Sequence, residues 1–232
     1  MTRLETAFAR CRAAKETALV TYVMGCDPDP TTSRAMALAC VAGGADVLEI
    51  GIPFSDPIAD GPTIQRAAQR ALGRGTTTED VLALAAGVRA RCEAPIALMG
   101  YLNPILAHGP ERFFDDCAKA GVDALIVPDL LPEEADGLSR LAAARDVGLV
   151  FLLAPTSNAQ RIQAAARAST AFVYFVSVTG VTGARRALPD ELGPQVASVR
   201  TEAQVPVVVG FGVSSAEQAR ALAPLADGVV VG

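Results

Sequence analysis

The sequence predicts an α/β fold, a (β/α)8 barrel of the TIM type. Short apolar runs rich in Val, Ile and Leu alternate with amphipathic segments along all 232 residues. Eight such runs, each preceded by a helical segment, fit this barrel near the small end of its size range. A doubly wound open sheet is the alternative, but no Gly-x-Gly-x-x-Gly motif follows the first strand. Since no linker, charge run or low-complexity tract divides the chain, we expect one barrel domain over residues 1–232.

The elements are expected in a regular order. Thr2 and Glu5 form a capping-box pattern, which predicts a short extra helix before the first strand. Strands are expected near 18–24, 47–52, 95–100, 124–127, 149–153, 172–176, 207–210 and 229–231. Helices are expected near 31–42, 63–72, 78–91, 111–120, 133–145, 159–168, 189–200 and 216–222, with a turn at 101–104. Gly232 directly follows the eighth strand, so the eighth outer helix is expected to be missing and the barrel to stop after that strand.

A weak internal repeat supports this alternation. Residues 42–46 (AGGAD), 120–123 (AGVD) and 225–227 (LAD) each lead directly into a predicted strand. In the first two, glycine is the residue expected at the end of the preceding helix.

Composition excludes several classes of function. The net charge is −5 and the adjacent arginines at 185 and 186 are the only such pair, which argues against a nucleic-acid surface. No apolar run reaches the length of a membrane span, and Lys15 and Glu16 interrupt any signal-peptide core. The five cysteines are widely spaced without a Cys-x-x-Cys pair, which is typical of small buried residues in a reducing compartment. We therefore expect a cytoplasmic protein.

Histidine and lysine are scarce. The single histidine, His108, lies beside Gly109 in a segment expected to be a polar loop, so we expect a solvated side chain and no metal site. Lys15 and Lys119 are the only lysines, and both lie in predicted helices. Because no strand delivers a lysine to an active site, Schiff-base chemistry is improbable.

The stretch from Gly44 to Pro62 joins a buried strand to a rigid acidic loop. Glu49 lies inside the apolar run, where a carboxylate is costly unless the protein uses it. Asp60 lies at the end of the proline-rich loop, so the two carboxylates indicate an acid/base site. Two other interpretations are open at this point. Glu49 is either catalytic or a satisfied core residue, and Asp60 is either catalytic or a residue that favours the start of the next helix.

Residues at the carboxyl ends of barrel strands line the usual active-site mouth. Tyr22, Met99 and Tyr174 lie late in the first, third and sixth strands, where the tyrosines are either barrel filling or hydrogen-bond donors to a pocket. Glycine-rich segments follow strands six and seven (179–183 and 210–212), and Gly232 ends strand eight. This is the usual phosphate position of the fold, and the long loop over 177–189 is expected to be a lid.

These features indicate a phosphorylated small substrate, two carboxylates, and no lysine, metal or cofactor motif. To break a C–C bond without a Schiff base or a metal, the substrate must supply its own electron sink. A protonated heteroaromatic ring would do so.

The run LEIGIPFSDPIADGPTIQRA (48–67) closely resembles the signature of the tryptophan synthase α subunit. The segments TGVTGAR (179–185), VVVGFGV (207–213) and YLNP (101–104) agree in order and spacing. The resemblance covers essentially the whole chain. It implies retro-aldol cleavage of indole-3-glycerol phosphate into indole and glyceraldehyde 3-phosphate. It also implies no cofactor in this chain and a pyridoxal-phosphate-dependent β subunit as partner, in an α2β2 heterotetramer.

The resemblance also implies residue roles. Glu49 would be the general acid/base, Asp60 would bind the indole N–H and stabilise its positive charge, and Tyr174 would support Glu49. The remaining substrate contacts would come from Tyr22, Met99, Thr182, Gly183, Phe211, Gly212 and Gly232, with Thr182 closing over Asp60 and the glycines and Phe211 at the phosphate. The partner would dock on the rim that carries Pro53, Asp56, Asn103 and Asp129.

The chain departs from the family pattern at three places. Tyr22 stands where the family commonly has Phe, and the second proline of 128–132 is shifted. The family continues past Gly232 with a serine, a phosphate-binding helix and the last barrel helix.

Two other functions are possible for such a barrel. One is that of an indole-3-glycerol phosphate synthase, whose chemistry resembles one that needs active-site lysines, which this chain lacks. The other is that of a non-catalytic barrel that regulates a partner.

Overall fold

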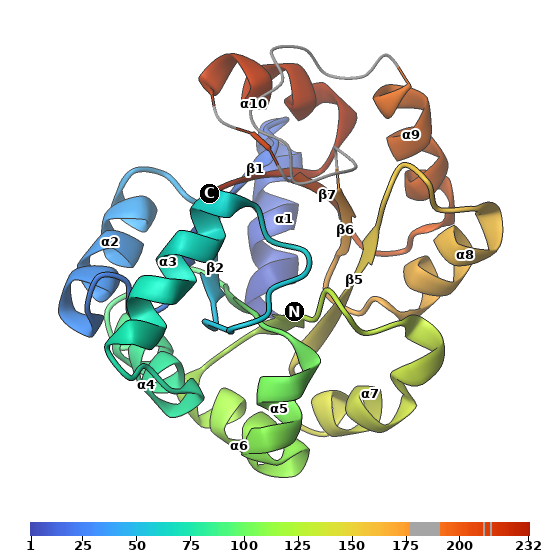
Figure 1. The fold of residues 1–232 in the computed structure, drawn as a ribbon. Helices are drawn as coiled ribbons and strands as arrows, with labels where there is room; N and C mark the ends of the chain where they lie inside the picture. Colours follow the sequence, from blue (N-terminus) through green and yellow to red (C-terminus); the bar gives the residue numbers. More distant parts are fainter. Residues whose placement is uncertain (177–190, 211, 214) are drawn as a thin grey trace.

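The computed structural model describes residues 1–176, 191–210, 212–213 and 215–232. Within these residues eight parallel strands form a closed barrel in sequence order, with β8 paired to β1 (Figure 1). The strands are β1 (Ala18–Met24), β2 (Val47–Gly51), β3 (Ile96–Met99), β4 (Ala124–Ile126), β5 (Gly148–Leu153), β6 (Val173–Val176), β7 (Val207–Gly210) and β8 (Gly228–Val231). The predicted barrel is confirmed, with each strand close to its predicted position.

Helices surround the barrel, and the first of them covers one of its ends instead (Figure 1). They are α1 (Arg3–Ala14), α2 (Pro30–Ala42), α3 (Pro62–Gly73), α4 (Thr78–Arg89), α5 (Leu102–His108), α6 (Pro110–Ala120), α7 (Asp136–Ala143), α8 (Ala159–Ala168), α9 (Leu192–Glu202) and α10 (Ala216–Leu222), with short 3-10 turns η1 (Pro132–Glu134) and η2 (Ala223–Leu225).

Two expectations about these helices are wrong. The segment predicted as a turn at 101–104 begins α5, because the Asp129 carboxylate accepts a hydrogen bond from the Leu102 N–H at 2.9 Å and so satisfies a donor at the helix start. The helix predicted over 133–145 is divided into η1 and α7, with the break at Ala135.

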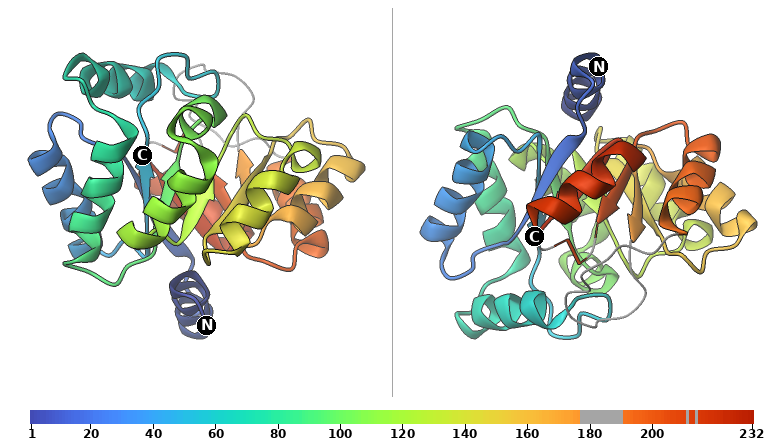
Figure 2. Two further views of the ribbon diagram at one scale, coloured as in Figure 1. Left: turned by 90° about the horizontal axis from the view of Figure 1, so that it is seen from below. Right: turned by 90° about the horizontal axis from the view of Figure 1, so that it is seen from above.

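The extra helix α1 closes one end of the barrel. Thr2 and Glu5 form the predicted capping box, and Leu4, Phe8 and Cys11 bury one face of the helix among the residues of the barrel interior. The Phe8 and Phe172 ring centroids lie 6.2 Å apart. Figure 2 shows α1 projecting at the end opposite to α3, so α1 does not cover the other mouth of the barrel.

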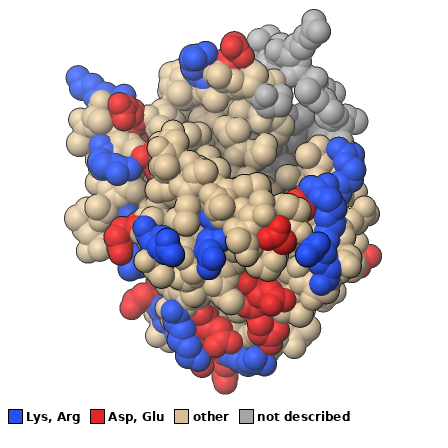
Figure 3. Space-filling model, turned by 90° about the vertical axis from the view of Figure 1, so that its left-hand side faces the viewer, with Lys and Arg blue, Asp and Glu red and all other residues tan. Residues whose placement is uncertain are grey.

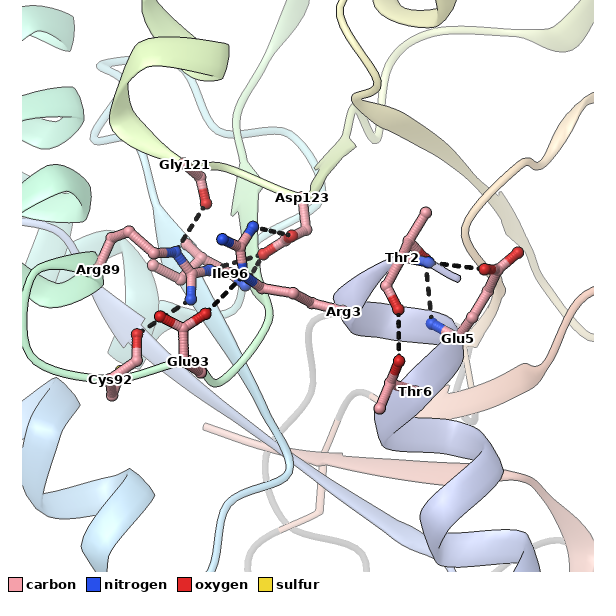
Figure 4. Close-up of polar contacts among 10 residues, drawn as sticks. All are labelled: Thr2, Arg3, Glu5, Thr6, Arg89, Cys92, Glu93, Ile96, Gly121 and Asp123. Atoms are coloured by element: carbon pink, nitrogen blue, oxygen red, sulfur yellow. Dashed lines mark hydrogen bonds and ion pairs between the residues drawn. The ribbon is translucent and has the colours of Figure 1, made fainter.

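The weak repeat has a structural role at the α1 end of the barrel. The Asp46, Asp123 and Asp227 carboxylates each accept a hydrogen bond from the N–H at the start of the neighbouring strand: Leu19 at 2.9 Å, Ile96 at 2.8 Å and Val207 at 2.9 Å. Each also pairs with arginine; Asp123 binds Arg89 at 2.7 Å and Arg3 at 3.2 Å (Figure 4). The three carboxylates therefore join β1 to β2, β3 to β4 and β7 to β8.

His108 contradicts the expectation of a solvated loop histidine. Its side chain is 3% exposed, and its Nε2 lies 3.0 Å from the Asp116 carboxylate. Its ring makes an edge contact with Phe113, with the centroids 5.9 Å apart. Because α5 ends at His108 and α6 begins at Pro110, the sharp turn at Gly109 brings His108 against α6.

On the face drawn in Figure 3, basic and acidic side chains of the described residues are interspersed and form no large patch of one charge. Of the helices in the described part, none is long and apolar enough to cross a membrane. The five cysteines, all within that part, are free.

Candidate active site

Strand β2 places Glu49 inside the barrel. Leu48 and Ile50 pack into the core outside the barrel, so the alternation of a strand turns Glu49 inward. The residue is 1% exposed, and its Oε2 has no hydrogen-bond partner among the described residues. Burial, followed by the nearby Asp60, raises the Glu49 pKa to about 8. The alternative interpretation of Glu49 as a core carboxylate with all its hydrogen bonds made does not agree with this unpartnered oxygen.

Asp60 comes from the loop between β2 and α3 and is 6% exposed. Burial raises its pKa to about 6, while a hydrogen bond with the Tyr101 hydroxyl opposes this rise. The helix that follows begins with Gly61 as its cap residue and has no side-chain cap. Asp60 is therefore not the N-cap residue of this helix.

Tyr101 holds the loop that carries Asp60. It lies two residues beyond the end of β3 and is 3% exposed. Its hydroxyl accepts a hydrogen bond from the Ala59 N–H at 3.0 Å, and its ring packs on Phe54 with the centroids 5.4 Å apart. Tyr101 is a site residue that the sequence analysis missed. Its position just after a predicted barrel strand, where active-site side chains lie in this fold, could have indicated it.

Tyr22 and Tyr174 occupy the barrel interior near the same mouth, each beside a glycine of the next strand. A Cβ on Gly51 would lie 2.8 Å from Tyr22 Cζ and even closer to the hydroxyl, and a Cβ on Gly210 would lie 2.7 Å from Tyr174 Cζ. In each case the glycine lies two residues beyond the register partner of the tyrosine.

The environment keeps both phenols protonated. Burial raises their pKa values most, and nearby acidic groups add to the rise: Asp60 and then Glu49 for Tyr22, and Glu49 first for Tyr174. The two phenols are therefore donors beside two carboxylates that ionise near neutral pH.

The other predicted substrate residues are placed as follows. Met99 is buried at the end of β3, within the interior cluster of Tyr174. Gly212 is exposed after β7 with φ of +75°, which favours glycine. Gly232 lies against Tyr22, with its Cβ position 3.2 Å from the tyrosine Cβ. Thr182, Gly183, Phe211 and the expected lid at 177–189 lie outside the described residues.

The chemistry of this mouth is proton transfer. Glu49 and Asp60 have raised pKa values of about 8 and 6, which bracket neutral pH. Within the described ranges, no group of three or more His, Cys, Asp and Glu residues could hold a metal ion. The two lysines lie elsewhere: Lys15 ends α1, and Lys119 on α6 pairs with Asp116.

Comparison with known proteins identifies the family. The family model described as "Tryptophan synthase alpha chain" matches residues 8–232. The chain belongs to the tryptophan synthase alpha chain family.

Relatives support the same membership. The tryptophan synthase alpha chains of Pelobacter propionicus and Citrifermentans bemidjiense are 50% and 51% identical over 232 residues, which are 100% of this chain and 87% of each relative. The structure of Mycobacterium tuberculosis tryptophan synthase superposes with a TM-score of 0.93 at 40% identity, over 100% of this chain and 88% of that chain. The tryptophan synthase alpha chain of Legionella pneumophila gives a TM-score of 0.91 at 37% identity, over 100% of this chain and 85% of the other.

The predicted partner rim is partly exposed. Asp56 and Asn103 are exposed, whereas Pro53 is buried and Asp129 is half-buried with its carboxylate on the Leu102 N–H. Their part in a partner interface remains a prediction. Two exposed apolar side chains lie near them: Ile58, 78% exposed, is in the loop of Asp56, and Leu106, 50% exposed, is on α5 with Asn103.

Proposed function

We propose that this chain cleaves indole-3-glycerol phosphate into indole and glyceraldehyde 3-phosphate, the carbon–carbon lyase step of tryptophan biosynthesis. The observation that carries this proposal is the buried Glu49, whose pKa is raised to about 8 and whose Oε2 is unpartnered among the described residues. A carboxylic acid that exchanges its proton near neutral pH is suited to act first as an acid and then as a base.

The reaction follows from the two carboxylates. Protonated Glu49 gives its proton to indole C3, and the ring nitrogen becomes positively charged. Ionised Glu49 then takes the proton of the hydroxyl on the carbon attached to C3. The O–H electron pair forms the aldehyde C=O, the C–C bond breaks, and its electrons return to the ring, which leaves as indole.

Asp60 stabilises the charge that develops on the ring. With a pKa of about 6 it is mainly ionised at pH 7, and its buried setting strengthens its attraction for the indole nitrogen cation. Tyr101 fixes the loop at Ala59, so the carboxylate is held in place before the substrate arrives. Tyr174 supports the Glu49 end, and Met99 contributes to the apolar surroundings.

The phosphate is proposed to bind where the carboxyl ends of β7 and β8 meet. Gly212 and Gly232 lie there, and Gly183 and Phe211 are proposed to complete this subsite with Thr182 closing over Asp60. Backbone N–H groups of glycine segments approach an anion closely, which suits a phosphate ester.

The partner is proposed to be a tryptophan synthase β subunit that holds pyridoxal phosphate and receives the indole, in an α2β2 assembly in the cytoplasm. The proton transfers proposed for this chain use its own side chains, with no cofactor in this chain. Asp56 and Ile58 follow β2, Leu106 is on α5 after β3, and all three side chains are exposed. A partner docked on these segments would cover the Asp60 loop and exclude water.

Indole release from indole-3-glycerol phosphate, with and without a β subunit, tests the function. We expect turnover by the unmodified chain and a loss of about 10²–10⁴-fold in Glu49→Gln. Glu217→Gln is the matched control, because this side chain on α10 is 81% exposed, and it should keep full activity. A β-subunit response without any cleavage would instead favour the non-catalytic regulatory barrel.

A further inference from the structure

The hydroxyl of Tyr22 lacks a good acceptor. Its hydrogen-bond partner among the described residues is the thioether sulfur of Met24, at 3.9 Å. A thioether is a weak acceptor, so this half-buried hydroxyl can still donate a stronger hydrogen bond to a better acceptor. The hydroxyl therefore indicates a ligand atom that accepts a hydrogen bond.

The Tyr22 side chain, on β1, reaches from the end of β8 to the end of β2 at the mouth of the barrel. At one end Gly232, at the end of β8, has its Cβ position 3.2 Å from Tyr22 Cβ and 3.5 Å from Cγ. At the other end the hydroxyl fills the space above Gly51, the last residue of β2. Tyr22 is also the register partner of Glu49. The ring therefore lies between the proposed phosphate subsite and the proposed acid/base.

The chemistry of the substrate decides which group meets this donor. The indole ring offers an N–H and a π face but no in-plane lone pair, so it cannot accept a conventional hydrogen bond. The acceptors of indole-3-glycerol phosphate are the oxygens of its glyceryl chain and phosphate. The glyceryl chain joins indole C3, which Glu49 protonates, to the phosphate, and this is the span beside which the Tyr22 ring lies.

We propose that Tyr22 is a specificity-determining residue whose hydroxyl donates a hydrogen bond to a glyceryl oxygen of the substrate. This proposal rests on the proposed function and adds a contact that phenylalanine at position 22 cannot make. Burial and the two neighbouring carboxylates raise the Tyr22 pKa, so the hydroxyl remains a donor. The contact favours the hydroxylated substrate over the indole product, which has no oxygen to bind.

The test compares two ligands in two proteins. Indole-3-glycerol phosphate and indole-3-propanol phosphate share the ring and the phosphate, but the second lacks the glyceryl hydroxyls. Their Kd values are measured by calorimetry in Glu49→Gln and in Glu49→Gln/Tyr22→Phe, so that turnover does not disturb binding. Tyr22→Phe removes one oxygen and no carbon, and Met24→Leu in the same background is the control.

We expect Tyr22→Phe to weaken indole-3-glycerol phosphate about three- to tenfold, the effect of one uncharged hydrogen bond, and to leave indole-3-propanol phosphate within about twofold. Met24→Leu should leave the ratio of the two Kd values unchanged. Equal weakening of both ligands, or no change in either, would overturn the proposal. These outcomes are separate from the proposed function, which fails only if the unmodified chain releases no indole.

Discussion

The Tyr101 hydroxyl, just beyond the end of β3, accepts a hydrogen bond from the Ala59 N–H at 3.0 Å, in the loop after β2. The next residue, Leu102, donates its N–H to Asp129, in the loop after β4. The loops after β2, β3 and β4 are therefore joined at Tyr101 and Leu102. The catalytic candidate Asp60 directly follows Ala59, the residue that Tyr101 binds.

Tyr101→Phe should move the pH profile of the enzyme. The lost hydrogen bond lowers the Asp60 pKa in the native protein, so its removal raises that pKa above about 6. Because the reaction needs ionised Asp60, the acidic limb of kcat/KM should shift to higher pH, as measured by indole release between pH 5 and 9. Phe54→Leu removes the ring that packs on Tyr101 but keeps the Tyr101 hydroxyl, so the acidic limb of its kcat/KM profile should stay in place. An unmoved limb in Tyr101→Phe would show that this bond does not tune Asp60.

Glu49→Gln should remove a pH dependence of stability. The Glu49 pKa is raised from 4.5 to about 8 by folding, so the folded state holds the proton more tightly than the unfolded state. The stability linked to this proton is complete below pH 4.5 and is lost as the pH rises towards 8. Between pH 5 and 8 the free energy of unfolding of the unmodified chain should fall by about 3 kcal/mol relative to Glu49→Gln. Urea unfolding at both pH values measures this, and parallel behaviour of the two proteins would contradict the raised pKa.

Asp60→Asn should separate binding from turnover. Asparagine still accepts a hydrogen bond from the indole N–H, but it cannot neutralise the charge that develops in the transition state. We expect kcat to fall about 10²–10³-fold while the Kd of indole-3-propanol phosphate changes little. A loss confined to Kd would make Asp60 a binding residue.

Asp56→Lys should weaken the complex with a β subunit. Asp56 is exposed and its carboxylate contacts only the Ser55 hydroxyl, at 2.5 Å, among the hydrogen bonds of the described residues. Its reversal therefore changes the charge of the rim without disturbing the Asp60 contacts. Stimulation of indole release by the β subunit should be lost and the basal rate kept. Glu217→Lys, on α10, is the control and should keep the stimulation. Unchanged binding and stimulation in Asp56→Lys would place the interface elsewhere.

Asp123→Ala should affect stability and spare activity. The change leaves the Ile96 N–H and the buried side of Arg89 without their carboxylate, which costs about 2–4 kcal/mol. The site is at the end of the barrel opposite to the active-site mouth, so kcat should be unchanged at a temperature where the protein is folded. Asp115→Ala, which breaks the exposed pair with Arg145, should cost less than about 1 kcal/mol. Comparable losses in both variants would show that Asp123 is an ordinary surface carboxylate.

The barrel could be predicted because its strands are buried on both faces and so appear as apolar runs. Strand β2 is buried at every position, and Glu49 was visible as the one ionisable residue within it. The same reasoning located the acidic loop, since prolines and aspartates interrupt the periodic pattern.

Contacts between distant segments could not be predicted. Tyr101 and Ala59 are 42 positions apart, and α5 begins where Asp129, 27 positions beyond Leu102, satisfies its first N–H. A local pattern such as YLNP carries no information about either partner and therefore suggested a turn. His108 was misplaced for the same reason, because its burial depends on how α5 and α6 meet at Gly109.

The fit of Tyr22 over Gly51, repeated by Tyr174 over Gly210, constrains the order in which mutations can accumulate. A side chain at either glycine would occupy space already taken by a phenol, so the glycine cannot change first without displacing the tyrosine. A smaller residue in place of the tyrosine creates no such clash, and only after that change is the neighbouring position free to accept a side chain. Each pair therefore has one accessible mutational path away from its present state, and we expect larger residues at 51 or 210 only in sequences that have already lost the phenol opposite.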